Sequence, residues 1–366
     1  MKTVFIVLPS LGDGGGERLA VDIASRLDKS IFNIKLISLY GKMQSINTSL
    51  AIKNNLDIIY LDKKIGFDFS IFKKIRKIFK KYKPDIIHSH TDVLLYLLPF
   101  YKKKQIKLHT IHSVAEKEAV GYQKLVRKIA FKNKKVIPVG ICDTVTDTIA
   151  RYYKMSKDKI PTIYNGINTK KYSFENRKRN DVFTWINVGT LYEVKNQIYL
   201  IDLFEKFQKK VPNSKLLILG DGPMKNEIKN YIDSKHLNDK IIMVGKVENV
   251  NDYLKIADVY VISSKYEGMP LSMIEAMSSG LPIVSTNVGG IRDVIKNAEN
   301  GYLFELQNDN DALEAFEKLY YDILLWELIS KNNIEKSKKY DYELMANAYT
   351  RLYLGEEAIN NEGTEL

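Results

Sequence analysis

The feature that most constrains the fold is a regular alternation of short apolar or β-branched runs with longer segments of helical period, sustained along nearly the whole chain. This alternation predicts βαβ units and therefore parallel sheets. The predicted strands fall at residues 3–8, 34–39, 58–61, 85–89, 107–111 and 135–139, and then at 183–188, 215–219, 241–244, 259–262, 282–285 and 301–304.

The segments between these runs carry apolar residues at helical spacing. In one of them Ile71, Ile75, Ile78 and Phe79 fall on a single stripe, between basic residues. The predicted helices include residues 15–27, 71–82, 249–257, 271–279 and 309–331.

A polar stretch at residues 175–181 separates two strand series of similar size. We therefore predict an α/β protein of two Rossmann-like, doubly wound domains, residues 1–168 and 169–340, that face one another across a central cleft. A C-terminal helix at about 341–355 is expected to cross back to the first domain, and 356–366 to form a flexible tail. In such domains ligands bind at the carboxyl ends of the strands, so the loops there hold the candidate functional residues.

Cysteine content and hydropathy exclude several classes of protein. Cys142 is the single cysteine, so neither a disulfide framework nor a cysteine-rich metal site is available. No stretch approaches the roughly 20 apolar residues of a membrane-spanning helix. The apolar run at residues 4–8 leads into Pro9 and not into a cleavage site, so no secretory signal is expected. We expect a cytoplasmic protein.

The formal charge of +12 is distributed very unevenly. Residues 1–170 hold 32 Lys and Arg against 14 Asp and Glu, a net charge of +18, whereas the remaining residues hold 24 against 30, a net charge of −6. A basic half is typical of a region that meets an anionic membrane, nucleic acid or an acidic substrate. The alternative is a lysine-rich composition that merely solvates a surface.

A glycine-rich loop, residues 12–18, follows the first predicted strand and opens the first predicted helix. Glycines let backbone amides approach a ligand closely, and a helix N-terminus favours phosphate. Glu17 stands where the third glycine of a dinucleotide-binding loop would be, and no Walker A lysine follows. The loop alone is therefore equally consistent with a tight turn.

Two carboxylates eight residues apart mark the second candidate site, at residues 263–282. Glu267 lies in a loop after a strand, and Glu275 lies on the helix that follows, which at about 100° per residue places it a little over two turns beyond Glu267. Glu275 is surrounded by apolar residues, where a charge needs a ligand or a donor group. An ordinary helix surface is the alternative.

Together these motifs resemble those of the retaining family-four glycosyltransferases (glycosyl transferases group 1), enzymes of the two-Rossmann GT-B fold. Residues 263–282 resemble the E-x7-E motif of that family, and 14–18 its GGxER loop. Asn165-Gly166-Ile167 resembles its inter-domain element, residues 220–223 its GDGP turn, and 279–290 its glycine-rich segment after the motif. The resemblance extends over nearly the whole chain.

The resemblance implies a role for each matching residue. Glu275 would accept hydrogen bonds from the ribose of the donor nucleotide, and Glu267 would contact the transferred sugar. Lys195 would neutralise the departing diphosphate, for which a salt-bridged surface lysine is the alternative. The residues expected to bind the donor are Gly15, Gly16, Gly189, Thr190, Lys195, Gly245, Lys246, Val247, Glu267, Gly268, Met269, Pro270, Leu271 and Glu275.

One residue departs from the family pattern. The family often has an arginine where this sequence has Thr190, so the diphosphate clamp is weaker or another basic residue, such as Arg292, replaces it.

His112, at the end of a first-domain strand, matches a histidine that lies beside the transferred sugar. His88 and His90, with Asp92 following, resemble a metal site, but one short loop supplies no complete ligand set. We expect neither a metal nor another cofactor.

The resemblance implies a retaining glycosyltransferase that moves a sugar from a nucleotide-diphosphate donor, favoured as a UDP-sugar, to a saccharide acceptor. The acceptor is expected to be lipid-linked, for example to a polyprenyl carrier, in bacterial surface-polysaccharide synthesis. The basic first domain would then meet the acceptor and the inner face of the cell membrane. A nucleotide-sugar 2-epimerase is the first alternative. A non-enzymatic nucleic-acid-binding protein is the second, although the sequence has no nucleic-acid motif, and we expect no nucleic-acid partner.

Overall fold

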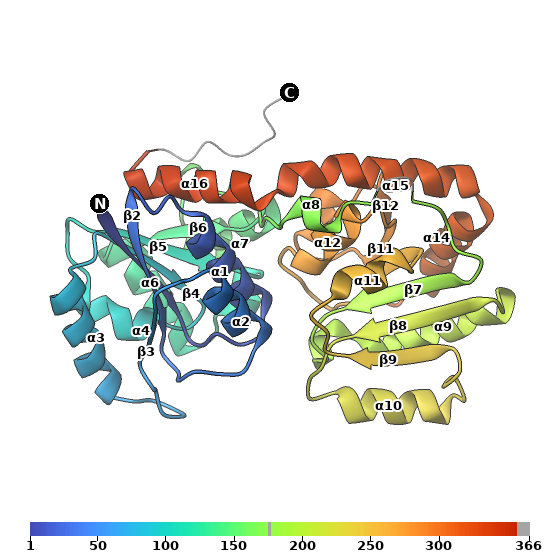
Figure 1. The fold of residues 1–366 in the computed structure, drawn as a ribbon, viewed down its shortest axis with the longest axis horizontal. Coiled ribbons are helices and arrows are strands. Elements are labelled where there is room, and N and C mark those ends of the chain that lie inside the picture. The colour runs from blue at the N-terminus through green and yellow to red at the C-terminus, as the bar shows by residue number, and fades with distance from the viewer. Residues whose placement is uncertain (175–176, 357–366) are drawn as a thin grey trace. The chain divides into compact units, whose positions relative to one another are not determined.

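The computed structural model describes residues 1–174 and 177–356, and its contacts divide the chain into two units (Figure 1). Unit 1 comprises Met1–Gly166 together with the described residues from Tyr342 onward, and unit 2 comprises Ile167–Asp341. The expected tail, 356–366, lies outside the described residues except for Glu356. Among the described helices, none is long and apolar enough to cross a membrane.

Unit 1 is built on one six-stranded parallel sheet with the strand order β3-β2-β1-β4-β5-β6. Most of the central strand residues are buried, as apolar runs covered on both faces should be. The order reverses between β1 and β4, and a doubly wound sheet binds ligands outside the strand ends at such a point. The strands are β1 Lys2–Leu8, β2 Phe32–Ser38, β3 Ile58–Tyr60, β4 Ile86–His90, β5 Ile106–Ile111 and β6 Ile137–Gly140.

The helices of unit 1 bury one face each. In α3 (Ser70–Tyr82) the predicted stripe is confirmed: Ile71, Ile75, Ile78 and Phe79 are buried, and most of the lysines are exposed. Helix α16 (Tyr342–Leu354) belongs to this unit and packs against α1. The other helices are α1 Gly15–Arg26, α2 Ile46–Lys53, α4 Leu94–Leu97, α5 Ala115–Glu118, α6 Tyr122–Asn133 and α7 Asp143–Tyr153.

Unit 2 repeats the same topology, with the strand order β12-β11-β10-β7-β8-β9 (Figure 1). Its order reverses between β7 and β10, which are hydrogen-bonded neighbours. The strands are β7 Phe183–Val188, β8 Ser214–Leu219, β9 Ile241–Gly245, β10 Val259–Ile262, β11 Ile283–Thr286 and β12 Gly301–Phe304. Each of the predicted strands overlaps one of these twelve, so the predicted α/β class with two parallel sheets is confirmed.

The helices of unit 2 pack on a core centred on Trp185, which stacks on Phe316 with ring centroids 3.5 Å apart. The single helix predicted at 309–331 is wrong. Asp322 interrupts it with a non-helical backbone, and its side chain accepts a hydrogen bond from the Leu325 N–H at 2.9 Å to begin a new helix. The helices are α8 Thr169–Tyr172, α9 Gln197–Lys210, α10 Lys225–Ser234, α11 Val250–Lys255, α12 Leu271–Ser278, α13 Ile291–Val294, α14 Asp309–Tyr321 and α15 Ile323–Ser337.

Candidate functional site

The candidate site of unit 2 lies where its strand order reverses, beyond the carboxyl ends of β7 and β10. Two loops meet there, residues 189–196 after β7 and residues 263–270 after β10. A small pocket between them is lined by Gly189, Lys195, Ser264, Glu267 and Pro270, among others. The structure thus brings together residues that are more than 70 positions apart in the sequence.

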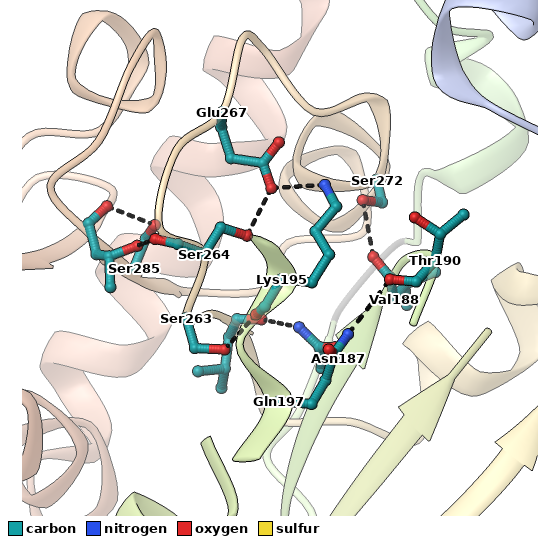
Figure 2. A network of polar contacts seen from close by, with 12 residues as sticks. Asn187, Val188, Thr190, Lys195, Gln197, Ser263, Ser264, Glu267, Ser272 and Ser285 are labelled. Atoms are coloured by element: carbon teal, nitrogen blue, oxygen red, sulfur yellow. Dashed lines mark hydrogen bonds and ion pairs between the residues drawn. The ribbon is translucent and has the colours of Figure 1, made fainter. Parts of the chain in front are cut away.

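An ion pair forms the centre of this pocket. The Lys195 Nζ lies 2.6 Å from the Glu267 Oε1, and the Ser264 hydroxyl donates to the same oxygen at 2.6 Å. Figure 2 shows both donors meeting this oxygen while Oε2 is turned away from them. Glu267 is 8% exposed, whereas a quarter of the Lys195 side chain remains accessible. The expected alternative for Lys195 is a salt-bridged surface lysine; the salt bridge is present, but Lys195 is partly buried and its partner is the other residue predicted for the site.

Main-chain contacts hold the two loops together. The Ser263 hydroxyl donates to the carbonyls of Lys195 and Asn196 at 2.9 and 3.1 Å, as Figure 2 shows for Lys195. The Lys265 N–H donates to the Val194 carbonyl at 2.8 Å. Lys195 ends a 3-10 turn, Glu193–Lys195, and α9 begins two residues later. These contacts fix the two loops relative to one another, and they therefore also fix the positions from which Lys195 and Glu267 pair.

A glycine pair from the segment after β11 supports the Glu267 loop from behind. Gly289 has φ +51°, and a Cβ at this position would lie 1.8 Å from the Glu267 carbonyl oxygen. The Gly290 N–H donates to the Gly268 carbonyl at 2.9 Å. A side chain at 289 would displace the backbone that carries Glu267, which explains in physical terms why a glycine stands at this position.

Glu275 lies on α12, and its carboxylate accepts a hydrogen bond from the Tyr172 hydroxyl at 2.8 Å. It is partly buried, so the expectation that this carboxylate needs a donor is met by a protein group. The predicted spacing of two helical turns between Glu267 and Glu275 is wrong. Helix α12 begins only at Leu271, because Pro270 has an extended backbone, and Glu267 therefore belongs to the preceding loop.

Serine and tyrosine side chains that the sequence did not single out complete the wall of the pocket. The Ser272 hydroxyl donates to the Val188 carbonyl at 3.1 Å and accepts from the Tyr260 hydroxyl at 2.7 Å. Burial raises the pKa of Tyr260 well above its ordinary value, so its hydroxyl stays a donor at neutral pH. Ser272 lies in the first turn of α12 and Tyr260 lies within β10, so the sequence carried no signal that would have indicated either of them as a pocket residue.

Two further glycines, Gly220 and Gly245, lie at neighbouring strand ends of unit 2. Gly220 has φ +138°, and a Cβ there would lie 1.8 Å from the Gly189 carbonyl oxygen, so the two turns touch. The Gly220 N–H donates to the Gly245 carbonyl at 2.8 Å. Gly245, Lys246 and Val247 thus lie at the same edge of the sheet, after β9, although none of them lines the pocket around Glu267.

Thr190 and Arg292 have different surroundings. Thr190 is half-buried, and its carbonyl accepts from the Gln197 amide at 3.5 Å (Figure 2). Arg292 is exposed and donates to the Asn287 carbonyl at 3.0 Å. Neither residue lines the pocket around Glu267, so within the described part of unit 2 the structure does not bring Arg292 in as the substitute cation.

In unit 1 the glycine loop and His112 come together. Helix α1 begins at Gly15, and a Cβ on Gly16 would lie 3.3 Å from the His112 ring, so this helix start fits closely against the imidazole. Glu118 accepts hydrogen bonds from the N–H groups of His112 and Ser113, the latter at 2.7 Å. Burial lowers the pKa of His112, which favours a neutral ring.

The histidines that resembled a metal site belong to a buried hydrogen-bond chain. His88 lies 2.7 Å from the hydroxyls of both Tyr353 and Thr110, and the His90 Nδ1 lies 3.0 Å from the His112 Nε2. Burial lowers the pKa of His88 to about 3. Across the described residues no three potential metal ligands gather in one place. His88 and His90 therefore act here as structural partners of the C-terminal helix and of His112.

Comparisons with known proteins match a glycosyltransferase family model to each half of the chain. The model of the Glycosyltransferase Family 4 matches residues 13–171, and that of the Glycosyl transferases group 1 matches residues 168–339. Over 355 residues the chain is 25% identical to an uncharacterized glycosyltransferase of Haemophilus influenzae, covering 94% of this chain and 97% of the relative.

Two further matches are informative. The chain is 29% identical over 286 residues to the UDP-Gal:alpha-D-GlcNAc-diphosphoundecaprenol alpha-1,3-galactosyltransferase of Escherichia coli, covering 72% of this chain and 73% of that enzyme. The crystal structure of HepE of Anabaena, in complex with UDP and glucose, superposes with a TM-score of 0.82 at 15% identity and covers 98% of this chain and 100% of its own. At that identity the likeness shows the fold.

These matches support a transferase and give no support to the 2-epimerase alternative. The two family models follow one another along the chain and meet at the boundary between unit 1 and unit 2. The chain therefore belongs to the glycosyltransferases of the GT-B fold, with a Family 4 domain followed by a group 1 domain.

Proposed function

We propose that this glycosyltransferase is a retaining enzyme that moves a sugar from a UDP-sugar to a lipid-linked saccharide acceptor in bacterial polysaccharide synthesis. The observation that carries the proposal is the Lys195–Glu267 pair, which joins two hydrogen-bonded loops at the point where the strand order of unit 2 reverses. The names of relatives support the substrate classes: the Escherichia coli enzyme is named for UDP-Gal and a diphosphoundecaprenol acceptor, and CapH of Staphylococcus aureus for capsular polysaccharide.

Lys195 and Glu267 would each bind a different part of the donor. The Lys195 ammonium is partly accessible and would turn from Glu267 to the diphosphate when the donor binds, so that it stabilises the charge that develops on the leaving group. Glu267 Oε2, turned away from Lys195 and Ser264, would accept hydrogen bonds from hydroxyls of the transferred sugar.

The other residues of unit 2 would hold the nucleotide. Glu275, already oriented by Tyr172, would accept from the ribose hydroxyls. Backbone amides of residues 268–271 would bind the sugar and phosphates at the beginning of α12, where the helix dipole favours negative charge. Gly189 and Thr190 would approach the diphosphate, and residues 245–247 the base.

In unit 1 we assign the backbone of Gly15 and Gly16 to the diphosphate and His112 to the transferred sugar. The acceptor hydroxyl would attack the anomeric carbon on the face from which the diphosphate leaves. The bond from that carbon to the phosphate oxygen breaks, the bond to the acceptor oxygen forms, and the acceptor proton passes to the departing phosphate. Charge stabilisation would come from Lys195 and helix termini, and we propose that no metal is needed.

We further propose that unit 1 lies at the inner face of the cell membrane. Six basic residues on or directly after α3 are exposed, namely Lys73, Arg76, Lys77, Lys80, Lys81 and Lys83. A basic residue near an anionic leaflet contributes about 1 kcal/mol, so a few acting together would give reversible binding. Co-sedimentation with anionic vesicles at low and high salt tests this, and equal recovery in the supernatant under both conditions would contradict it.

The function is tested by incubating the protein with UDP-, GDP- and ADP-sugars and a membrane extract, and then determining the anomeric configuration of the product by NMR. We expect transfer from a UDP-sugar with the donor's configuration retained and without added divalent metal. An inverted product, or a new free sugar nucleotide formed without acceptor, would refute the proposal.

A further inference from the structure

Unit 1 contains a larger cavity, of about 710 Å³, that none of the roles above uses. It lies among the residues that follow β1, β2, β3 and β4, together with α4 and α6. Its wall is mainly apolar and aromatic and includes Leu39, Phe67, Leu94, Tyr96, Tyr122 and Val126. A cavity of this size and composition is typical of a site for a small organic ligand.

One part of the wall carries buried polar groups whose hydrogen-bonding capacity is not fully used. Arg127 is 2% exposed, and its Nη2 forms an ion pair with Glu118 at 2.9 Å, while its Nη1 makes no geometrically good hydrogen bond within the described chain. The buried hydroxyl of neighbouring Thr91 likewise has no hydrogen-bond partner among the described residues. Buried donors without acceptors are costly, so inside this cavity they are expected to be satisfied by oxygens of water or of a bound ligand that replaces it.

The charges around these donors point to an uncharged ligand head. Arg127 is balanced by Glu118 at 2.9 Å and Asp92 at 3.7 Å. Lys63, which also lines the cavity, restores neutrality to the group. A free phosphate would meet the Asp92 carboxylate in the wall and an Arg127 already paired with Glu118, whereas sugar hydroxyls can both accept from Arg127 and donate to Asp92.

The surface beside the cavity exposes large apolar side chains on two separate segments. Ile65 and Phe69, between β3 and α3, are 97% and 77% exposed, and Leu125 of α6 is 59% exposed. Phe67 and Tyr122, which line the cavity itself, belong to the same two segments. Apolar surface left in water at both sides of a pocket indicates an apolar ligand or partner.

We propose that this cavity binds a single-chain amphiphile with a hydroxyl-rich, uncharged head. The head contacts Thr91, Asp92 and Arg127, and the chain passes over Phe67 and Tyr122. The inference rests on the proposed function, because such a ligand is a saccharide acceptor with its own apolar anchor. It adds that the anchor is recognised by the enzyme directly, so that a free saccharide is a poor acceptor.

The test is calorimetric titration of the full chain with n-octyl glucoside, kept below its critical micelle concentration, and with methyl glucoside. Each methylene that becomes fully buried strengthens binding about fourfold, so we expect the octyl glycoside to bind at least about tenfold more tightly, with a negative heat-capacity change. Equal affinity of the two glycosides would overturn the proposal.

Exposed positions allow variants that should leave the fold intact. Tyr122→Ser and Phe67→Ser, at positions that are 65% and 54% exposed, are expected to reduce the preference for the octyl chain to below about threefold. The matched controls Tyr321→Ser and Leu324→Ser, at residues of unit 2 that are 68% and 74% exposed, should not alter it. Loss of vesicle binding in the unit 1 variants with an unchanged octyl preference would also overturn the proposal, because the segments would then serve only as a membrane surface.

A thermal shift with UDP, measured on the same variants, distinguishes a failure of the cavity assignment from a failure of the proposed function. Retained UDP binding without octyl preference refutes the cavity assignment alone. Absence of any shift with UDP in the wild-type protein counts against the proposed function itself.

Discussion

Substituting Gly289 by alanine perturbs the candidate site without touching any of its polar side chains. The new Cβ would lie 1.8 Å from the Glu267 carbonyl oxygen, and contact between these atoms requires more than 3 Å, so one backbone must move by over 1 Å. The alanine must in addition adopt φ +51°, which costs an L-residue roughly 1–2 kcal/mol. With the relief of the steric overlap we expect a loss of about 3 kcal/mol in the free energy of unfolding of unit 2.

The loss of activity should exceed what this destabilisation explains. A displacement of about 1 Å at a group that contacts the substrate can reduce the rate about 100-fold. Urea unfolding and UDP-sugar turnover, measured at a temperature where Gly289→Ala is folded, test both effects. Gly355→Ala is the control, because it has φ +87° but its Cβ meets only the Ile106 side chain, at 3.9 Å. Transfer by Gly289→Ala within twofold of wild type would refute the reasoning.

Three further predictions concern single interactions. Asp322→Ala removes the N-cap of α15 and should lower stability by about 1 kcal/mol in urea unfolding without changing transfer, whereas an unchanged midpoint would contradict the cap. Burial lowers the pKa of His88 to about 3, so the unfolded chain binds a proton below about pH 6.5 that the native chain does not. His88 alone should then lower stability by up to about 1.4 kcal/mol per pH unit as the pH drops from 6.5 toward 4, and a His88→Asn variant should show a shallower decline. His90→Phe removes the contact between His90 Nδ1 and His112 Nε2 and is expected to lower kcat more than it raises KM for the donor, and a change in KM alone would argue against this positioning role.

Much of the fold follows from local sequence patterns. Twelve apolar runs predicted twelve strands because a strand buried on both faces must be apolar throughout its length. The helix beginning at Gly15 followed from the glycine loop, and the buried stripe of α3 from its spacing. The break at Asp322 was missed because the apolar periodicity continues across it, and only the cap geometry reveals two helices.

The candidate site was predictable as a set of residues but not as an arrangement. Glu267, Glu275 and Lys195 stood out in the sequence, whereas the partners that orient them lie far away in the chain. Tyr172 is 103 positions from Glu275, and the contact of Gly289 with Glu267 exists only after β11 and β10 have paired. Arg127 could not be predicted as a site residue for a similar reason. An arginine in a lysine-rich helix is expected to be exposed, and only the tertiary structure shows that it is buried.

The most direct test of the central claim, that Lys195 beside Glu267 receives the donor diphosphate, is calorimetric titration of UDP into the wild-type protein, Lys195→Met and Lys265→Met. Lys265 is the matched control, because it is a lysine of the neighbouring loop that pairs with the exposed Glu193 at 2.7 Å and does not line the pocket. A hydrogen bond to a charged group contributes about 1.5–3 kcal/mol, so we predict that Lys195→Met weakens UDP binding at least about tenfold while Lys265→Met leaves it unchanged. Equal affinity of wild type and Lys195→Met would contradict the account.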